Sequence, residues 1–115
     1  MGAINIETIT DPSHSITAAE AYGSVFVNGD NDAVDLTLPS AVAGMAVFIV
    51  QGQGVSGAIT IQPNTNDYLV VDGVRGSAAT DYVSTGAAGD RICVVAVSAD
   101  DWVVTTETGT WAEPE

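Results

Sequence analysis

The chain has 115 residues, 46% of them hydrophobic, and its formal net charge is −13 because fifteen Asp and Glu oppose two Arg. This length fits one domain with a single core. A field this negative repels phosphates and anionic lipids, so nucleic acids and membranes are not expected partners. One His, one Cys and no Lys leave few groups for general-base or nucleophilic chemistry, so we expect neither an enzyme nor a bound cofactor.

The first fourteen residues read as a segment apart from the main domain. Their apolar side chains are Ile4, Ile6 and Ile9, and Asp11-Pro12 separates this set from the rest of the chain. We expect residues 1–14 to form an arm that adds as a strand to the sheet edge of a partner. The alternative is a plain edge strand of the same domain.

Strand patterns begin after a short helical turn. Thr17 and Glu20 match a capping box, and Gly23 limits the helix to about one turn. Strands are predicted over 24–27 and 33–38, with Asn28-Gly29 between them as a tight hairpin turn. The apolar run over 45–50 predicts a central strand buried on both faces.

The second half of the chain continues this rhythm. Residues 52–57 match G-x-G-x-x-G, but a strand pattern comes next in place of the helix that a dinucleotide site needs, which favours a hairpin turn. Further strands are predicted over 58–62 and 68–71, around Tyr82-Val83, and in a closing hairpin of 91–97 with 102–104.

This rhythm predicts an all-β, single-domain β-sandwich or jelly-roll-like barrel of about eight short antiparallel strands. The domain is expected to span residues 15–111, with an acidic tail over 112–115.

A few side chains are candidates for a site. Asp30, Asp32 and Asp35 are weak candidates for binding Ca²⁺, and a solvated turn is the favoured interpretation. His14 is expected to be exposed in a linker, and Arg75 and Arg91 are each expected to pair with a nearby carboxylate. Trp102 and Trp111 are candidates for core or subunit contacts, or for a sugar-stacking platform.

Three segments, in this order, carry a family resemblance. They are 16–20 leading into 25–28; 34–41 with Gly44; and Gly89-Asp90-Arg91 through Trp102-Val103-Val104 to Gly109-Thr110-Trp111. Together they resemble small β-rich modules of tailed-bacteriophage virion proteins, found in head decoration proteins and in tail or head fibres. The resemblance spans about residues 15–111. It implies a structural role on the virion surface, usually as a homotrimer, and supplies no catalytic residues.

Within that class we expect a capsid decoration, or cement, protein bound to the major capsid protein on the outer surface of the head. A compact domain with a capsid-binding arm, here the segment with Ile4, Ile6 and Ile9, suffices for decoration, whereas a fibre needs an attachment domain or a shaft. The alternative is a tail-fibre or receptor-binding module that contacts host surface glycans. An independent carbohydrate-binding domain, based on the two tryptophans, is a third hypothesis.

Overall fold

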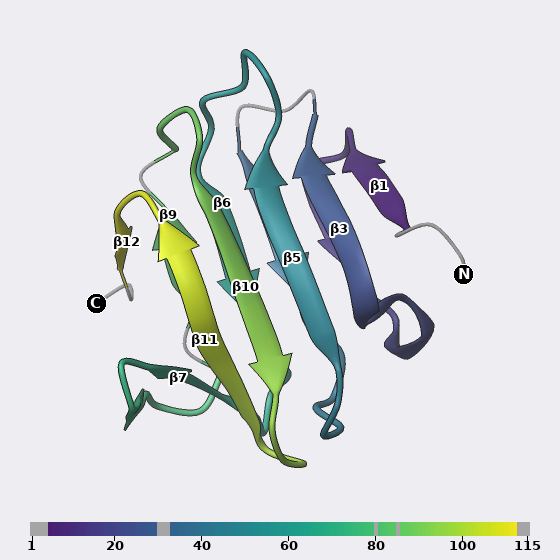
Figure 1. Cartoon of the computed structure of the whole chain (residues 1–115), viewed down its shortest axis with the longest axis vertical. Coiled ribbons are helices and arrows are strands. Elements are labelled where there is room, and N and C mark those ends of the chain that lie inside the picture. Colours follow the sequence, from purple (N-terminus) through teal and green to yellow (C-terminus); the bar gives the residue numbers. More distant parts are fainter. Residues whose placement is uncertain (1–4, 30–32, 80, 85, 113–115) are drawn as a thin grey trace.

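Two β-sheets packed face to face make up the structure, a computed structural model that describes residues 5–29, 33–79, 81–84 and 86–112 (Figure 1). Sheet A is nearest the viewer and has the strand order β1 (Ile6–Ile9), β3 (Tyr22–Asn28), β5 (Ala46–Gln51), β10 (Arg91–Ala96), β11 (Asp101–Thr108), β7 (Tyr68–Val71) and β8 (Val74–Arg75). Sheet B lies behind it, in the order β12 (Trp111–Ala112), β9 (Tyr82–Ser84), β6 (Ile59–Gln62), β4 (Val34–Thr37) and β2 (Ser13–Ser15).

The predicted all-β class and two-sheet sandwich are confirmed. The described residues hold twelve short strands, more than the eight expected. The expectation of antiparallel strands throughout is wrong, because five strand pairs are parallel and five are antiparallel. One 3₁₀ turn, η1 (Ala18–Glu20), carries the predicted Thr17–Glu20 capping box. In the described part of the chain no helix is long and apolar enough to span a membrane.

The parallel pairs arise because the first half of the chain winds alternately through the two sheets. β1, β3 and β5 lie side by side in sheet A, while β2, β4 and β6 lie side by side in sheet B. Each coil of the chain therefore adds one strand to each sheet. Asn28-Gly29 accordingly turns a corner from sheet A to sheet B, and the predicted hairpin there is wrong. Residues 52–57 likewise connect β5 to β6 in the other sheet and form no hairpin.

Backbone hydrogen bonds stack one coil on the next at these corners. The Gly29 amide donates to the Ile9 carbonyl over 3.0 Å, and the Gly52 amide donates to the Asn28 carbonyl over 2.9 Å. The buried Asn28 and Gln51 side chains continue the stack through a 2.9 Å hydrogen bond. A polar ladder at the corner satisfies groups that the alternating winding removes from water.

The N-terminal segment is the first of these coils and not a free arm over its described residues. β1 pairs with β3 along the edge of sheet A, and β2 pairs with β4 along the edge of sheet B. Ile9 is buried in the core, whereas Ile6 is exposed. Ile4 lies outside the described residues. The structure thus shows the edge-strand alternative for this segment.

The inner faces of both sheets form one hydrophobic core. Its largest fully buried side chains include Trp102, Phe26, Leu36, Leu38, Met45 and Ile49. The predicted closing hairpin is confirmed as β10 and β11, which pair antiparallel with an irregularity after Cys93. Burial of these aromatic and branched side chains is the main stabilising term for a sandwich of this size.

The stretch of chain after β8 returns to sheet B and reaches the corner at Gln51, whose Nε2 donates to the Gly86 carbonyl over 3.3 Å. Within it, β9 pairs with β6 and buries Tyr82 and Ser84. Gly86 has φ +85°, and a β-carbon there would lie 2.6 Å from the Ser56 carbonyl oxygen. Only glycine fits both the conformation and the space at this position.

Candidate functional site: the outer face of sheet A

The strand registers place a broad apolar surface on the outside of sheet A, here called the A face. Three rows of side chains cross the strands: Ile6, Val25, Phe48, Cys93 and Thr106; then Thr8, Val27, Val50, Arg91 and Thr108; then Ala46, Val95, Val103, Val70 and Arg75. Ile6 is 65% exposed and Phe48 41% exposed. Apolar groups gathered like this on a soluble protein mark an interaction surface more often than scattered ones do.

The A face overturns one expectation for the run at 45–50. This run forms β5, between β3 and β10 in the middle of sheet A, but only one of its faces is covered. Val47 and Ile49 point into the core, whereas Phe48 is exposed and Val50 half-buried. The strand is apolar on both sides, as is typical of strands buried on both faces, but nothing in the described structure covers its outer side.

An open hollow of about 520 Å³ lies on the A face over the ends of β5, β10 and β11. Phe48, Val50 and Cys93 supply apolar lining, while Arg91 and Thr106–Thr108 supply polar groups. The hollow forms where the register between β10 and β11 shifts after Cys93, since an irregularity of this kind bends a strand away from its neighbour. Cys93 is buried at this site and is a free thiol.

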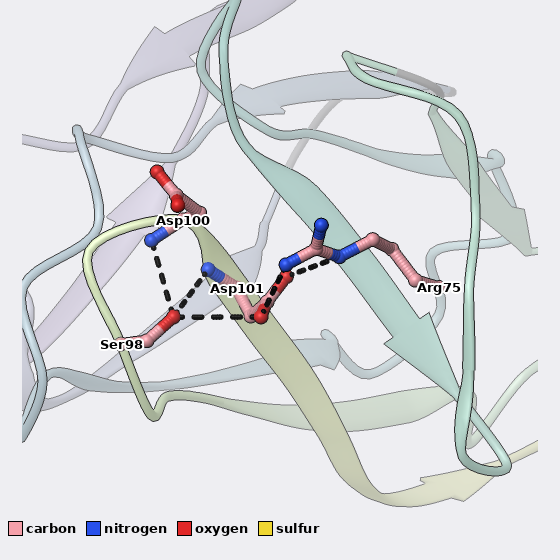
Figure 2. Close-up of polar contacts among 4 residues, drawn as sticks. All are labelled: Arg75, Ser98, Asp100 and Asp101. Carbon is pink, nitrogen blue, oxygen red and sulfur yellow. Dashed lines mark hydrogen bonds and ion pairs between the residues drawn. The ribbon is translucent and has the colours of Figure 1, made fainter.

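Both basic residues of the chain belong to the A face. Arg75 binds Asp101 in a two-pronged ion pair, with its Nε and one terminal nitrogen 2.9 and 2.8 Å from the two carboxylate oxygens (Figure 2). The guanidinium also lies 4.2 Å from the centre of the Tyr68 ring. The Asp101 carboxylate raises the pKa of Arg75 further above its ordinary value. The expected partnership of Arg75 with a nearby acid is therefore confirmed.

For Arg91, the structure differs from the expected pairing with a nearby carboxylate. Asp90, its neighbour in sequence, is buried and accepts a hydrogen bond from the Gly86 amide over 3.1 Å. No ion pair of Arg91 is found among the residues that the structure describes. Arg91 is exposed at the rim of the hollow. The A face thus combines apolar side chains with an available cation, although the whole chain carries −13.

The outside of sheet B, here called the B face, has the opposite character. The registers align Ser13, Asp35, Thr60, Val83 and Ala112 in one row and Ser15, Thr37 and Gln62 in another. These are mostly small polar or charged side chains, typical of a sheet that faces water.

Asp35, one of the three candidate Ca²⁺ ligands, is exposed on the B face, while Asp30 and Asp32 lie outside the described residues. Burial and the Asp35 charge raise the pKa of nearby Asp81, against a Gln62 hydrogen bond that lowers it.

The two tryptophans lie in the core and not on a surface. Trp102 is fully buried between the sheets. Trp111 stacks on Tyr82 at 5.6 Å between ring centres and donates from its ring nitrogen to the Thr108 carbonyl oxygen. A sugar-stacking platform made of these two rings is therefore wrong, because neither presents an open face.

No family model matches the chain, and no curated protein matches its sequence. A functional assignment therefore depends on the residues themselves, on the sandwich and on the resemblance to virion modules. Of the features of the described chain, the A face is the candidate for binding a partner.

Proposed function

We propose that this chain is a structural protein of a tailed-bacteriophage virion. In this role it is a capsid decoration protein that binds the major capsid protein on the outer surface of the head. It acts by binding and catalyses no reaction. The resemblance to virion modules supports this class of function.

The observation that carries the proposal is the uncovered outer side of β5. Phe48 is 41% exposed in the middle of sheet A, and half-buried valines lie on the two neighbouring strands, β3 and β10, and on β5 itself. Removing such a surface from water contributes about 25 cal/mol for each Å² of apolar area buried. A rigid sheet loses little conformational freedom when it docks, so more of this energy is available for affinity.

The charge distribution supports a defined orientation on the head. Arg91 and the neutralised Arg75–Asp101 pair lie on the A face, and Asp35 lies on the opposite B face. The hollow on the A face is lined by Arg91 and by Glu107, whose carboxylate accepts a hydrogen bond from the Tyr82 hydroxyl. A largely apolar face with few unpaired carboxylates suits a docking surface, because burying unpaired carboxylates would be costly. The acidic remainder would face solvent and keep decorated heads apart through charge repulsion.

We also propose that the protein assembles as a homotrimer on the virion. The resemblance supports this, and so do the sheet edges: β1 and β2 each leave one side unpaired in the described structure. Unpaired edges favour strand-to-strand contacts between copies. Sedimentation should show a trimer in solution or, if assembly needs the capsid, threefold clusters on decorated heads. A monomer at all concentrations, together with isolated single copies on heads, would contradict it.

Co-sedimentation with heads tests the decoration role. Purified protein is mixed with heads assembled from the major capsid protein of the same virus without this chain. We expect saturable binding at hundreds of copies per head. A Phe48→Asp variant should lose binding, while Val74→Asp, which changes an exposed valine on β8, should retain it. Absence of binding by the unmodified protein would refute the proposal.

A tail-fibre or receptor-binding module is the second candidate, and the hollow on the A face favours it. Phe48 beside Arg91, Thr106 and Thr108 offers an aromatic ring with nearby hydrogen-bonding groups, which suits a sugar. On this alternative the protein binds an array of host surface glycans and leaves heads undecorated. Arg91→Ala would then abolish glycan binding.

A further inference from the structure

Three side chains from separate elements converge at the edge where the two sheets meet. They are Glu7 on β1, His14 on β2 and Glu20 at the end of η1. The His14 Nε2 atom lies 3.3 Å from a Glu7 carboxylate oxygen and 3.5 Å from a Glu20 carboxylate oxygen. One atom from each residue lies within 4.8 Å of the other two.

The fold directs all three side chains to this point. Glu7 is level with the buried Phe26 and His14 with the buried Leu36, so both side chains point inward from the edge strands. The His14 ring packs against Phe26, with 5.7 Å between ring centres. This partly buried histidine corrects the expectation of an exposed linker residue.

The capping box fixes the third member. The Thr17 amide donates to Glu20 Oε1 over 2.9 Å, and the Glu20 amide donates to Thr17 Oγ1 over 3.3 Å. Glu20 is thereby held on the turn beside the two edge strands.

A second observation points to a bound cation. The His14 Nε2 atom is shielded from solvent and makes no hydrogen bond, although it faces two carboxylates. Two carboxylates this close together repel one another unless a positive charge lies among them, which either a protonated imidazole or a bound cation supplies.

We propose that Glu7, His14 and Glu20 bind a zinc ion. Zinc takes histidine nitrogen and carboxylate oxygen ligands at about 2.0–2.2 Å in tetrahedral geometry, which places ligand atoms about 3.4 Å apart. The observed separations of 3.3 and 3.5 Å match that spacing. Ca²⁺ and Mg²⁺ prefer sites made of oxygen alone, so the imidazole selects against them.

The bound ion would join the first coil of the chain to the rest of the sandwich. Glu7 belongs to sheet A, His14 to sheet B and Glu20 to the turn between β2 and β3. Three protein ligands leave a fourth position for water or for a group of a neighbouring molecule. β1 also carries Ile6 of the A face, so the ion would stabilise one border of the docking surface.

Zinc titration of the untagged, chelator-treated full chain tests this directly. We expect calorimetry to give one Zn²⁺ per chain and Tm to rise by at least about 3 °C at saturation. Co²⁺ should give the strong visible absorption of a tetrahedral site without a thiolate charge-transfer band, since Cys93 is not a ligand. His14→Gln and Glu7→Gln should each lower zinc affinity at least tenfold.

Two control variants keep the result interpretable. Asp72→Asn removes an exposed carboxylate in a turn, and Cys93→Ser removes the only thiol; both should bind zinc as the unmodified chain does. The proposal is overturned if the folded chain binds no Zn²⁺. It is equally overturned if His14→Gln, folded by circular dichroism, binds Zn²⁺ with unchanged affinity.

Discussion

The two outer faces of the sandwich follow the same alternation of side chains and yet differ in chemistry. Sheet A presents Ile6, Val25, Phe48 and Val95 to the outside, whereas sheet B presents mainly serine, threonine, aspartate and glutamine. Inner faces of both sheets are equally apolar. Selection for folding alone explains the inner faces and the B face, because a solvated outer face needs only polar residues. The A face is not explained in this way, and burial against a partner is the explanation that we propose.

The core that both sheets share is the place where substitution should do most damage. Trp102→Ala leaves a large cavity between the sheets, and we expect a loss of about 3–5 kcal/mol of unfolding free energy. Urea unfolding followed by circular dichroism measures it. Trp111→Ala, at the rim of the core and 9% exposed, should cost less. Equal losses for the two variants would contradict the assignment of Trp102 to the centre.

Substitution at the polar corner formed by Asn28 and Gln51 is expected to cause the second-largest loss of unfolding free energy. Gln51 donates to the Gly57 and Gly86 carbonyls and accepts from Asn28. Gln51→Leu orphans these buried groups, with an expected cost of about 2–3 kcal/mol. Gln53→Leu, at an exposed position in a turn, should cost less than about 0.5 kcal/mol. A cost for Gln51→Leu no larger than that of its control would show that the corner is open to water.

Asp81, near Asp35 of the B face, makes the stability of the sandwich depend on pH. Its pKa in the folded chain is raised above the ordinary value of 3.8, by burial and by Asp35. The folded state therefore holds the proton more tightly, and stability falls as pH rises from about 3.8 through the raised pKa. Asp81→Asn should stabilise the protein at pH 7, by up to about 1 kcal/mol, and should add nothing at pH 3.

Urea melts at pH 7 and pH 3 measure this difference. Asp72→Asn, an exposed carboxylate in a turn, should have no comparable effect at either pH. A stabilisation by Asp81→Asn of the same size at both pH values would show that charge plays no part.

The smallest expected effect on stability is at Phe48. Because this side chain is 41% exposed, Phe48→Thr should change the unfolding free energy of the isolated chain by no more than about 0.5 kcal/mol. The neighbouring Ile49→Thr, on the inner side of the same strand, should cost several times more. A large loss from Phe48→Thr in the isolated, monomeric chain would mean that the A face is already covered.

Period-two alternation and β-branched composition are enough to predict the all-β class, the closing hairpin and most strands. They do not predict which sheet each strand joins. Asn28-Gly29 suits a hairpin turn locally, but the stacking of Gly29 on Ile9 and of Gly52 on Asn28 turns the chain to the other sheet. Such contacts between distant residues are invisible to local turn preferences.

The candidate site shows the same limit. The run at 45–50 is correctly predicted as a central strand, but its expected burial on both sides depends on composition alone. An apolar composition shows that a strand can be buried on both sides, but only the fold shows whether another part of the chain covers each side. Glu7, His14 and Glu20 lie in three different elements. Their cluster could not be predicted from the sequence, because it forms only when the chain folds β1 and β2 beside η1. The Thr17–Glu20 spacing is the one local signal near it.

A pair of matched substitutions on the two faces tests the central claim most directly. Phe48→Asp changes the A face and Val83→Asp changes the B face, and circular dichroism melting confirms that both variants fold. Binding to undecorated heads is then measured for each. If the A face is the docking surface, Phe48→Asp should lower the affinity for heads at least a hundredfold, because docking would bury an unpaired charge. Val83→Asp should change the affinity less than threefold. Equal affinities, or a loss confined to Val83→Asp, would contradict it.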